Sequence, residues 1–317
     1  MIRFDNVTKH YAEGARPAVD GLSMEVPDGA VVVLIGPSGC GKSTTLRMVN
    51  RMIEPDGGAV LLDGSDVRDV RPEELRRRIG YAIQGVGLFP HWTVHQNIGV
   101  VPWLLKWDQP RIEARIRDLL ELVGLDPVLY DGKYPDELSG GEAQRVGVAR
   151  ALAADPPILL MDEPFGAVDP LTRDRLQTEF VDIQRRLRKT VVFVTHDMDE
   201  AVRLGDRIAI MRDGRLLQYD TPERILAYPA DGFVAGFVGQ ERALKRLSLA
   251  PVTEALGPVD AAEGCIATVR GDATLREALA KILEYGTDVV SVTDESGACI
   301  GSVSVETIVD RFRRPLT

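Results

Sequence analysis

The chain has 317 residues, 44% of them hydrophobic, and a formal net charge of −10, so it has room for two or three domains with ordinary cores. The acidic balance argues against a nucleic-acid binder, because no broad basic field collects phosphates. No apolar run approaches the roughly eighteen residues of a membrane span, and the first residues lack the apolar core of a signal peptide.

The N-terminal part predicts strands around a glycine-rich loop. Residues 2–7 alternate in polarity like an edge strand, and residues 22–26 predict a second strand. The apolar run 30–35 leads into the loop 36–44, and a helix-compatible segment follows. Short antiparallel strands are expected near 59–62, beside the loop.

The glycine-rich loop has the composition and the setting of a P-loop: a strand, then the loop, then a helix. Its glycines let several backbone N–H groups point at one phosphate, and the helix presents its positive end to the same anion. Lys42 can reach the β- and γ-phosphates, and Ser43 can ligate Mg²⁺. A plain glycine-rich turn explains neither side chain. The expected ATP-binding loop residues are Gly36, Pro37, Ser38, Gly39, Cys40, Gly41, Lys42, Ser43 and Thr44.

Cysteine usage predicts a reduced, cytosolic protein. The three cysteines, Cys40, Cys265 and Cys299, are too few and too scattered for a disulfide framework or a zinc site. Cys40 lies inside the phosphate loop, where we interpret it as a small filler.

The pattern of residue types changes in the middle of the chain, after a predicted strand that ends at Gln84. Residues 85–105 are irregular and rich in aromatic side chains, and apolar residues then recur at helical spacing. We predict a helical insertion over about 88–153. Apolar runs at 157–161 and 190–194 predict buried parallel strands.

Polar side chains stand where these strands end, which is where parallel sheets bind ligands. Asp162 can hold the magnesium shell, and Glu163 can accept a proton from an attacking water. His196 is a candidate γ-phosphate contact, although a histidine there is often only a satisfied polar residue. Gln84 can touch the metal or the water. Tyr11 can stack on the adenine, with a surface aromatic as the alternative.

A second glycine pair precedes the helix-compatible run 143–154. Ser139 and Glu142 fit a capping box, which alone explains a helix start. Gly140 and Gly141, however, each cost about 1 kcal/mol of helix stability relative to alanine. They leave bare N–H groups at a positive helix end, which suits a phosphate from another nucleotide.

Together these motifs resemble, in family order over about 240 residues, the ATPase subunit of an ATP-binding-cassette (ABC) transporter. The family's motifs fall on 36–44 (Walker A), Gln84 (Q-loop), 138–142 (signature), 158–162 (Walker B), Glu163 (catalytic carboxylate), 167–170 (D-loop) and His196 (switch). Val168 stands where the family usually has leucine, but Asp169 is retained.

The resemblance implies an α/β fold: a P-loop NTPase (RecA-like) core with an antiparallel β subdomain and the helical insertion. It implies ATP and Mg²⁺ as cofactors and a head-to-tail homodimer that buries two ATP molecules. Each ATP then lies on Lys42 of one chain and near residues of the other, namely Ser139, Gly140, Gly141, Glu142 and Asp169. The resemblance further implies that ATP binding closes the dimer, that hydrolysis and release let it open, and that this clamp moves a membrane permease.

The loop after Gln84 resembles the importer form of the family, in which it docks on the permease. The expected docking residues are Leu88, Phe89, Pro90, His91 and Trp92. Their pattern is most similar to importers of quaternary amines: glycine betaine, choline, carnitine or proline. An extracytoplasmic binding protein and a peripheral place on the cytoplasmic membrane face are implied. Alternatives are a plain apolar loop, an importer for an amino acid, sulfonate or polyamine, or a soluble ABC ATPase.

The C-terminal part predicts a second, α+β domain. We expect the nucleotide-binding domain over 1–236, a linker over 237–244 and this domain over 245–317. Residues 274–307 resemble a CBS module, which in osmoprotectant importers tunes transport. Only one module is visible, and Thr307 stands where nucleotide-binding modules have aspartate. A dimerisation domain without a ligand is the alternative.

Overall fold

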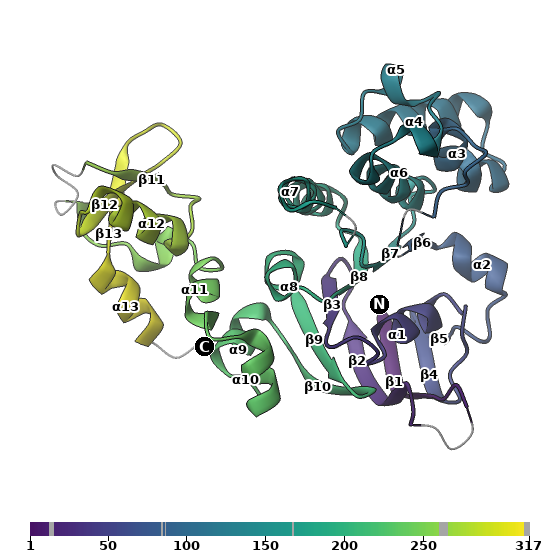
Figure 1. Ribbon diagram of the computed structural model, residues 1–317, viewed down its shortest axis with the longest axis horizontal. Coiled ribbons are helices and arrows are strands. Elements are labelled where there is room, and N and C mark those ends of the chain that lie inside the picture. Colours follow the sequence, from purple (N-terminus) through teal and green to yellow (C-terminus); the bar gives the residue numbers. More distant parts are fainter. Residues whose placement is uncertain (13–15, 84, 86, 167, 260–265, 314–317) are drawn as a thin grey trace. The chain divides into compact units, whose positions relative to one another are not determined.

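The computed structural model describes residues 1–12, 16–83, 85, 87–166, 168–259 and 266–313. The chain forms two compact units, Met1–Thr221 and Pro222–Thr317, and each has its own hydrophobic core (Figure 1). The second unit begins earlier than the domain boundary expected near residue 236, because helices α9 (Pro222–Ala227) and α10 (Gly232–Val238) group with it.

A six-stranded sheet forms the centre of the first unit, in the order β10-β9-β3-β8-β7-β6. Its strands β9, β3, β8, β7 and β6 are parallel, and β10 pairs with β9 as an antiparallel hairpin. β3, β7 and β8 are buried along their whole length, as expected for central parallel strands. The strands are β3 (Val31–Ile35), β6 (Ile79–Ala82), β7 (Ile158–Asp162), β8 (Thr190–Thr195), β9 (Arg207–Arg212) and β10 (Arg215–Asp220).

A four-stranded antiparallel sheet, β2-β1-β4-β5, packs with this sheet around a shared core. The prediction of β1 as an edge strand is wrong, because β1 pairs with β2 on one side and with β4 on the other. Its alternating burial reports that one face is covered, not how many strands flank it. The strands are β1 (Ile2–Lys9), β2 (Val19–Val26), β4 (Gly57–Leu62) and β5 (Ser65–Asp66).

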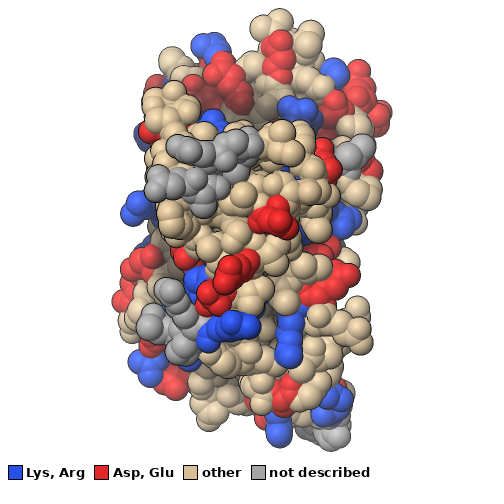
Figure 2. All heavy atoms as spheres, turned by 90° about the vertical axis from the view of Figure 1, so that its left-hand side faces the viewer, with Lys and Arg blue, Asp and Glu red and all other residues tan. Residues whose placement is uncertain are grey.

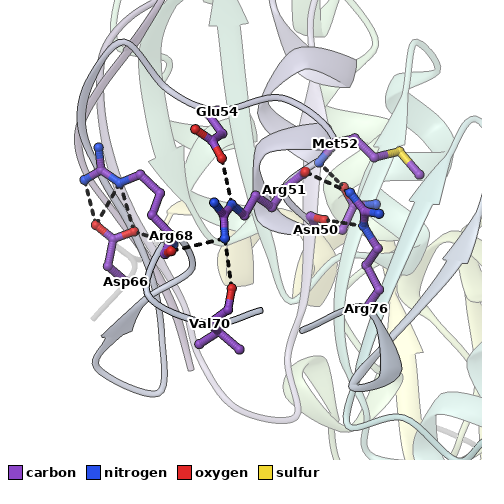
Figure 3. A network of polar contacts seen from close by, with 8 residues as sticks. All are labelled: Asn50, Arg51, Met52, Glu54, Asp66, Arg68, Val70 and Arg76. Atoms are coloured by element: carbon purple, nitrogen blue, oxygen red, sulfur yellow. Dashed lines mark hydrogen bonds and ion pairs between the residues drawn. The ribbon is translucent and has the colours of Figure 1, made fainter. Parts of the chain in front are cut away.

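Helix α1 (Lys42–Val49) is anchored at its C-terminal end by arginines (Figure 3). Arg51 donates to Glu54 Oε1 at 2.7 Å and to the carbonyl of Val70 at 2.9 Å. Arg76, on α2 (Pro72–Arg77), donates to the Asn50 carbonyl at 3.2 Å. The Arg76 bond satisfies the carbonyl of the C-cap residue Asn50, and the Arg51 bonds tie the segment directly after α1 to its surroundings.

Helices fill residues 94–152, in agreement with the predicted insertion. They are α3 (Val94–Leu104), α4 (Gln109–Leu122), α5 (Pro127–Tyr130), the 3₁₀ turn η1 (Pro135–Glu137) and α6 (Gly140–Leu152). The expectation of irregular chain up to residue 105 is wrong, because α3 begins with a capping box between Thr93 and Gln96. The six-stranded sheet also carries α7 (Pro170–Leu187) and α8 (Met198–Leu204).

The second unit is α+β. Its sheet has the order β11-β12-β13, with β11 and β12 parallel and β12 and β13 antiparallel. Thr274 caps α12 in a capping box with Glu277, and Gly286 (φ 60°) ends that helix. The elements are α9 (Pro222–Ala227), α10 (Gly232–Val238), α11 (Arg242–Leu247), η2 (Val252–Ala255), β11 (Thr268–Arg270), α12 (Leu275–Tyr285), β12 (Val289–Thr293), β13 (Cys299–Ser304) and α13 (Val305–Arg313).

Two surface properties bear on partners. In the part of the chain that the structure describes, no helix combines the length and the apolar character needed to span a membrane. Figure 2 shows one face of the molecule, on which basic and acidic side chains are intermingled rather than gathered by sign.

Candidate active site

The glycine loop is closed onto neighbouring backbone at two positions. A Cβ on Gly36 would lie 2.0 Å from the Met211 carbonyl oxygen, and one on Gly41 would lie 2.2 Å from that of Ala18. Both glycines have positive φ, 153° and 105°, a region that L side chains rarely adopt. The loop shape therefore requires glycine at both positions.

The start of α1 is arranged for an anion. Gly41 is its N-cap and offers no side chain to the first-turn N–H groups, which leaves them for a ligand. Lys42 is 6% exposed, and its Nζ donates to the carbonyls of Gly36 at 2.7 Å and of Pro37 at 3.1 Å. Burial raises the pKa of Cys40, which keeps this thiol neutral beside the lysine.

Ser43 and Asp162 bring together two side-chain oxygens of the kind that can hold a cation. The Ser43 hydroxyl donates to Asp162 Oδ1 at 2.9 Å, across from α1 to the end of β7. Asp162 is 1% exposed, and its Oδ2 has no hydrogen-bond partner among the described residues. Burial raises the pKa of this carboxyl. A hydroxyl and one carboxylate beside a phosphate site fit Mg²⁺, which keeps several waters and binds substrate phosphates.

Glu163 and His196 meet at the carboxyl edge of the sheet. Glu163 follows β7, and its N–H donates to the Val194 carbonyl at 3.0 Å. His196 follows β8, and its Nδ1 lies 3.5 Å from Glu163 Oε2. Glu163 has φ of +48°, which is uncommon for a residue with a side chain and typical of strained functional sites. A carboxylate and an imidazole this close together can serve as a general base and its orienting partner.

Tyr11 and Gln84 are the two other residues predicted to contact the nucleotide bound by their own chain, and the structure describes one of them. Tyr11 lies in the loop after β1, its ring is 64% exposed, and its hydroxyl is 3.1 Å from the Thr44 hydroxyl. An aromatic face is therefore available next to the phosphate loop. Gln84 lies outside the described residues.

The signature residues begin α6, and the capping box is present. Ser139 Oγ accepts from the Glu142 N–H at 3.3 Å, and Glu142 accepts from the Ser139 N–H at 2.7 Å. The Tyr130 hydroxyl donates to Glu142 at 2.6 Å, and this bond chiefly lowers the pKa of Glu142 to about 2. Ser139 and Gly140 are exposed. Gly141 also has a packing reason, since a Cβ there would lie 3.1 Å from a Thr172 methyl group.

Asp169 has a defined local role as the N-cap of α7. Its side chain accepts from the Thr172 N–H at 3.1 Å, and the preceding Val168 is buried. The D-loop carboxylate therefore orders the start of this helix.

The aromatic loop before α3 is held by a buried side chain, and its own aromatic side chains are exposed. Asn97 is fully buried, accepts from the Phe89 N–H at 2.8 Å and donates to the Trp92 carbonyl at 3.0 Å. The rings of Phe89 and Trp92 lie 4.5 Å apart and are 47% and 36% exposed. Pro90 and His91 between them are exposed.

Two charged residues near Glu163 were missed by the sequence reasoning. Arg173 and Glu200 line the same small pocket as Glu163 and His196. Glu200 had a readable signal, because it stands four residues before Leu204, at the spacing of one helix face, and this face of α8 is buried. Arg173 had none, since an arginine in a polar helix turn is ordinary.

The chain is similar to known proteins over most of its length. Residues 19–166 match the ABC transporter family. The choline transport ATP-binding protein OpuBA of Bacillus subtilis is 48% identical over 314 residues, which are 99% of this chain and 81% of that protein. The glycine betaine/carnitine/choline transport ATP-binding protein OpuCA of the same species is 47% identical over 315 residues (99% and 80%). The glycine betaine uptake system ATP-binding protein YehX of Escherichia coli is 46% identical over 310 residues (98% and 99%).

Other matches are confined to part of the chain. The spermidine/putrescine import ATP-binding protein PotA of Chromobacterium violaceum is 43% identical over 240 residues, 76% of this chain and 65% of that protein. The dimeric structure of a bacterial ABC transporter cassette has a TM-score of 0.64 and 33% identity, over 70% of this chain and 99% of that one. A post-hydrolysis dimer of this cassette, bound to ADP and Pi, has the same TM-score and coverage at 32% identity. The chain therefore belongs to the ABC transporter family and carries that family's ATPase cassette.

Proposed function

We propose that the chain is the ATP-hydrolysing subunit of an importer for quaternary-amine osmoprotectants: glycine betaine, choline, carnitine or proline. One observation carries the choice of solute. Three relatives named for choline or glycine betaine match 98–99% of the chain, including its C-terminal unit, whereas the polyamine relative matches 76% and another glycine betaine/carnitine relative matches 71%. The proposal extends to a peripheral position at the cytoplasmic membrane face.

Different residues of the chain are proposed to have different roles at the phosphate loop. Bound ATP supplies the phosphoanhydride bond, with Mg²⁺ to neutralise charge on its phosphates. The first-turn N–H groups of α1 and the Lys42 ammonium bind phosphate oxygens. Ser43 and Asp162 hold the cation. Glu163 accepts a proton from the attacking water, and His196, 3.5 Å away, orients that carboxylate and contacts the γ-phosphate.

A second copy of the chain completes the site. Ser139 and Gly140 are exposed at the positive end of α6, a position that suits a phosphate held by another chain. Asp169 belongs to the same proposed face. The matched cassette structures are dimers, which supports this assembly.

The permease is proposed to dock on the aromatic loop. Phe89 and Trp92 expose large apolar area on a backbone that Asn97 fixes, and exposed aromatic clusters mark partner sites. Leu88, Pro90 and His91 complete this surface. An extracytoplasmic binding protein delivers the solute to the permease.

The C-terminal unit is proposed to be a CBS-like regulatory module. Its strand and helix order supports this reading. Thr307, however, uses its hydroxyl locally, accepting from the Ser304 N–H at 3.1 Å and donating to its carbonyl at 3.0 Å. A dimerisation role without a ligand therefore stays the alternative for this unit.

Uptake by the intact transporter tests the proposal. Cells that express this chain with its permease and binding protein should accumulate labelled glycine betaine or choline, and Glu163→Gln should abolish this uptake. Uptake of spermidine, a sulfonate or an amino acid other than proline, with none of the quaternary amines, would contradict the solute class. Recovery of the chain with ribosomes and without a permease would contradict the transport role.

A further inference from the structure

Arg173, in the first turn of α7, lies between the two turns that carry Glu163 and His196. One end of its guanidinium donates to the Val168 carbonyl at 3.2 Å, in the turn that continues from Glu163. The other end lies 3.8 Å from Asp197 Oδ2, directly after His196. The Nε of Arg173 is buried and has no hydrogen-bond partner among the described residues. One side chain therefore spans both turns.

The backbone on either side of His196 is fixed by the same group of side chains. The Thr195 hydroxyl accepts from the Asp197 N–H at 3.0 Å and also hydrogen-bonds to Glu200. Glu200 is 5% exposed and accepts from Gln177 on α7 at 3.1 Å. His196 thus sits between two anchored neighbours, and Arg173 links one of them to the turn of Glu163.

Several acidic side chains lie close to Arg173, beside the Glu163 and His196 turns. A pocket of about 10 Å³, close to the size of one water molecule, is lined by side chains that include Glu163, Asp197, Glu200 and Arg173. Three residues with carboxyl groups and one with a guanidinium thus line the same pocket, and the Asp197 carboxylate lies 3.8 Å from that guanidinium. An arginine offers five N–H donors in a rigid plane, so it can serve a carbonyl, a carboxylate and a pocket water at once. A lysine has a single ammonium and cannot span both turns.

We propose that Arg173 is a positioning residue for ATP hydrolysis, which holds the Glu163 turn and the His196 turn at their working separation. It does not touch the nucleotide. The inference rests on the proposed roles of Glu163 and His196, and it adds a residue that those roles do not include. Because a misplacement of about 1 Å can cost about 10²-fold in rate, loss of this link should lower turnover and leave nucleotide binding intact.

Steady-state ATP hydrolysis by the full-length chain tests the inference. We expect Arg173→Gln to lower kcat by about 10- to 100-fold. Its KM for ATP and its ATP affinity should stay within about twofold of wild type, and its melting temperature should stay within a few degrees. Arg173→Lys, which keeps the charge near Asp197 but cannot bridge, should fall between the two. Arg175→Gln is the matched control, because Arg175 is 67% exposed on the same helix and pairs with Glu179. It should hydrolyse ATP like wild type.

The outcomes separate this inference from the assigned site. A wild-type kcat in Arg173→Gln overturns the inference, and so does a kcat loss matched by equal losses in Arg175→Gln. If Arg173→Gln does not unfold cooperatively, Arg173→Lys decides: reduced kcat with intact melting supports positioning, and unchanged kcat contradicts it. Normal turnover in Glu163→Gln would instead remove the proposed function of the site itself.

Discussion

Two helix starts in this chain are both candidates for phosphate, and they are built in opposite ways. Helix α1 begins after Gly41, which provides no side-chain cap, and its Lys42 is buried against loop carbonyls. Helix α6 begins with a complete capping box on Ser139, and its first residues face solvent. The first leaves its first-turn donors without a side-chain cap in an enclosed loop, and the second has its Glu142 N–H already bonded to Ser139 at an exposed helix end.

The difference indicates which half binds first. Uncapped N–H groups with a nearby ammonium gain most from an anion, whereas the N–H groups of Ser139 and Glu142 are already bonded to side chains and gain less. We infer that nucleotide binds at the P-loop and that the signature end of a second copy closes on the loaded site.

The largest effect is expected from Glu163→Gln. The amide keeps the shape of the side chain but cannot take a proton, so turnover should fall by about 10²–10⁴-fold while ATP still binds. Parallel measurements of phosphate release and ATP affinity check this. Near-normal release would show that another group is the base.

Gly41→Ala should damage the α1 half through its backbone. The new Cβ would lie 2.2 Å from the Ala18 carbonyl at a φ of 105°, so the loop must move or remain strained by about 1–3 kcal/mol. ATP affinity should fall about 5- to 150-fold, which is that free energy as a ratio. Gly39→Ala is the control, since its φ is 78° but no atom lies within 4 Å of a Cβ. Equal effects in both variants would rule out the close approach as the cause.

Ser139→Ala should act on the α6 half without changing ATP binding by the isolated chain. Loss of the N-cap should lower the free energy of unfolding by about 0.5–2 kcal/mol. Urea denaturation measures the stability, and ATP titration of the monomer measures affinity. A weakened monomer affinity would mean that the signature contacts ATP within its own chain.

Tyr130→Phe is expected to have the smallest effect, a loss of folding stability that is present at neutral pH and fades at acidic pH. The folded pKa of Glu142 is about 2, below its ordinary 4.5, so the charged carboxylate stabilises the fold above pH 4.5. That stabilisation is lost as the pH falls from 4.5 towards 2. Removal of the Tyr130 hydroxyl should therefore lower stability at pH 7, and the difference from wild type should shrink at pH 3. A difference that is constant with pH would contradict the assigned bond.

Much of the P-loop half was predictable because its signals are local. A buried strand, a glycine loop, Lys42 and Ser43 are consecutive, and Asp162 ends another apolar strand. The placement of β1 was not predictable, because polarity alternation reports burial of one face and not the number of neighbouring strands.

Two other features depended on less visible signals. Helix α3 contains Pro102, and its aromatic surroundings hid a helix start that the Thr93 and Gln96 capping pair marks. Arg173 was not predictable, because its partners come from the turns after two different strands and meet only in the folded chain.

Cross-linking between copies tests most directly whether the signature of one chain closes on the P-loop of another. In the Glu163→Gln background, one batch of chain carries Ser38→Cys and the other carries Ser139→Cys. Mixed with ATP and Mg²⁺ under mild oxidation, they should form a disulfide-linked dimer that is weak or missing without ATP. The parent chain, with its three native cysteines, should form none. A cross-link yield that is independent of ATP, or no cross-link despite measured ATP binding, would contradict the composite site.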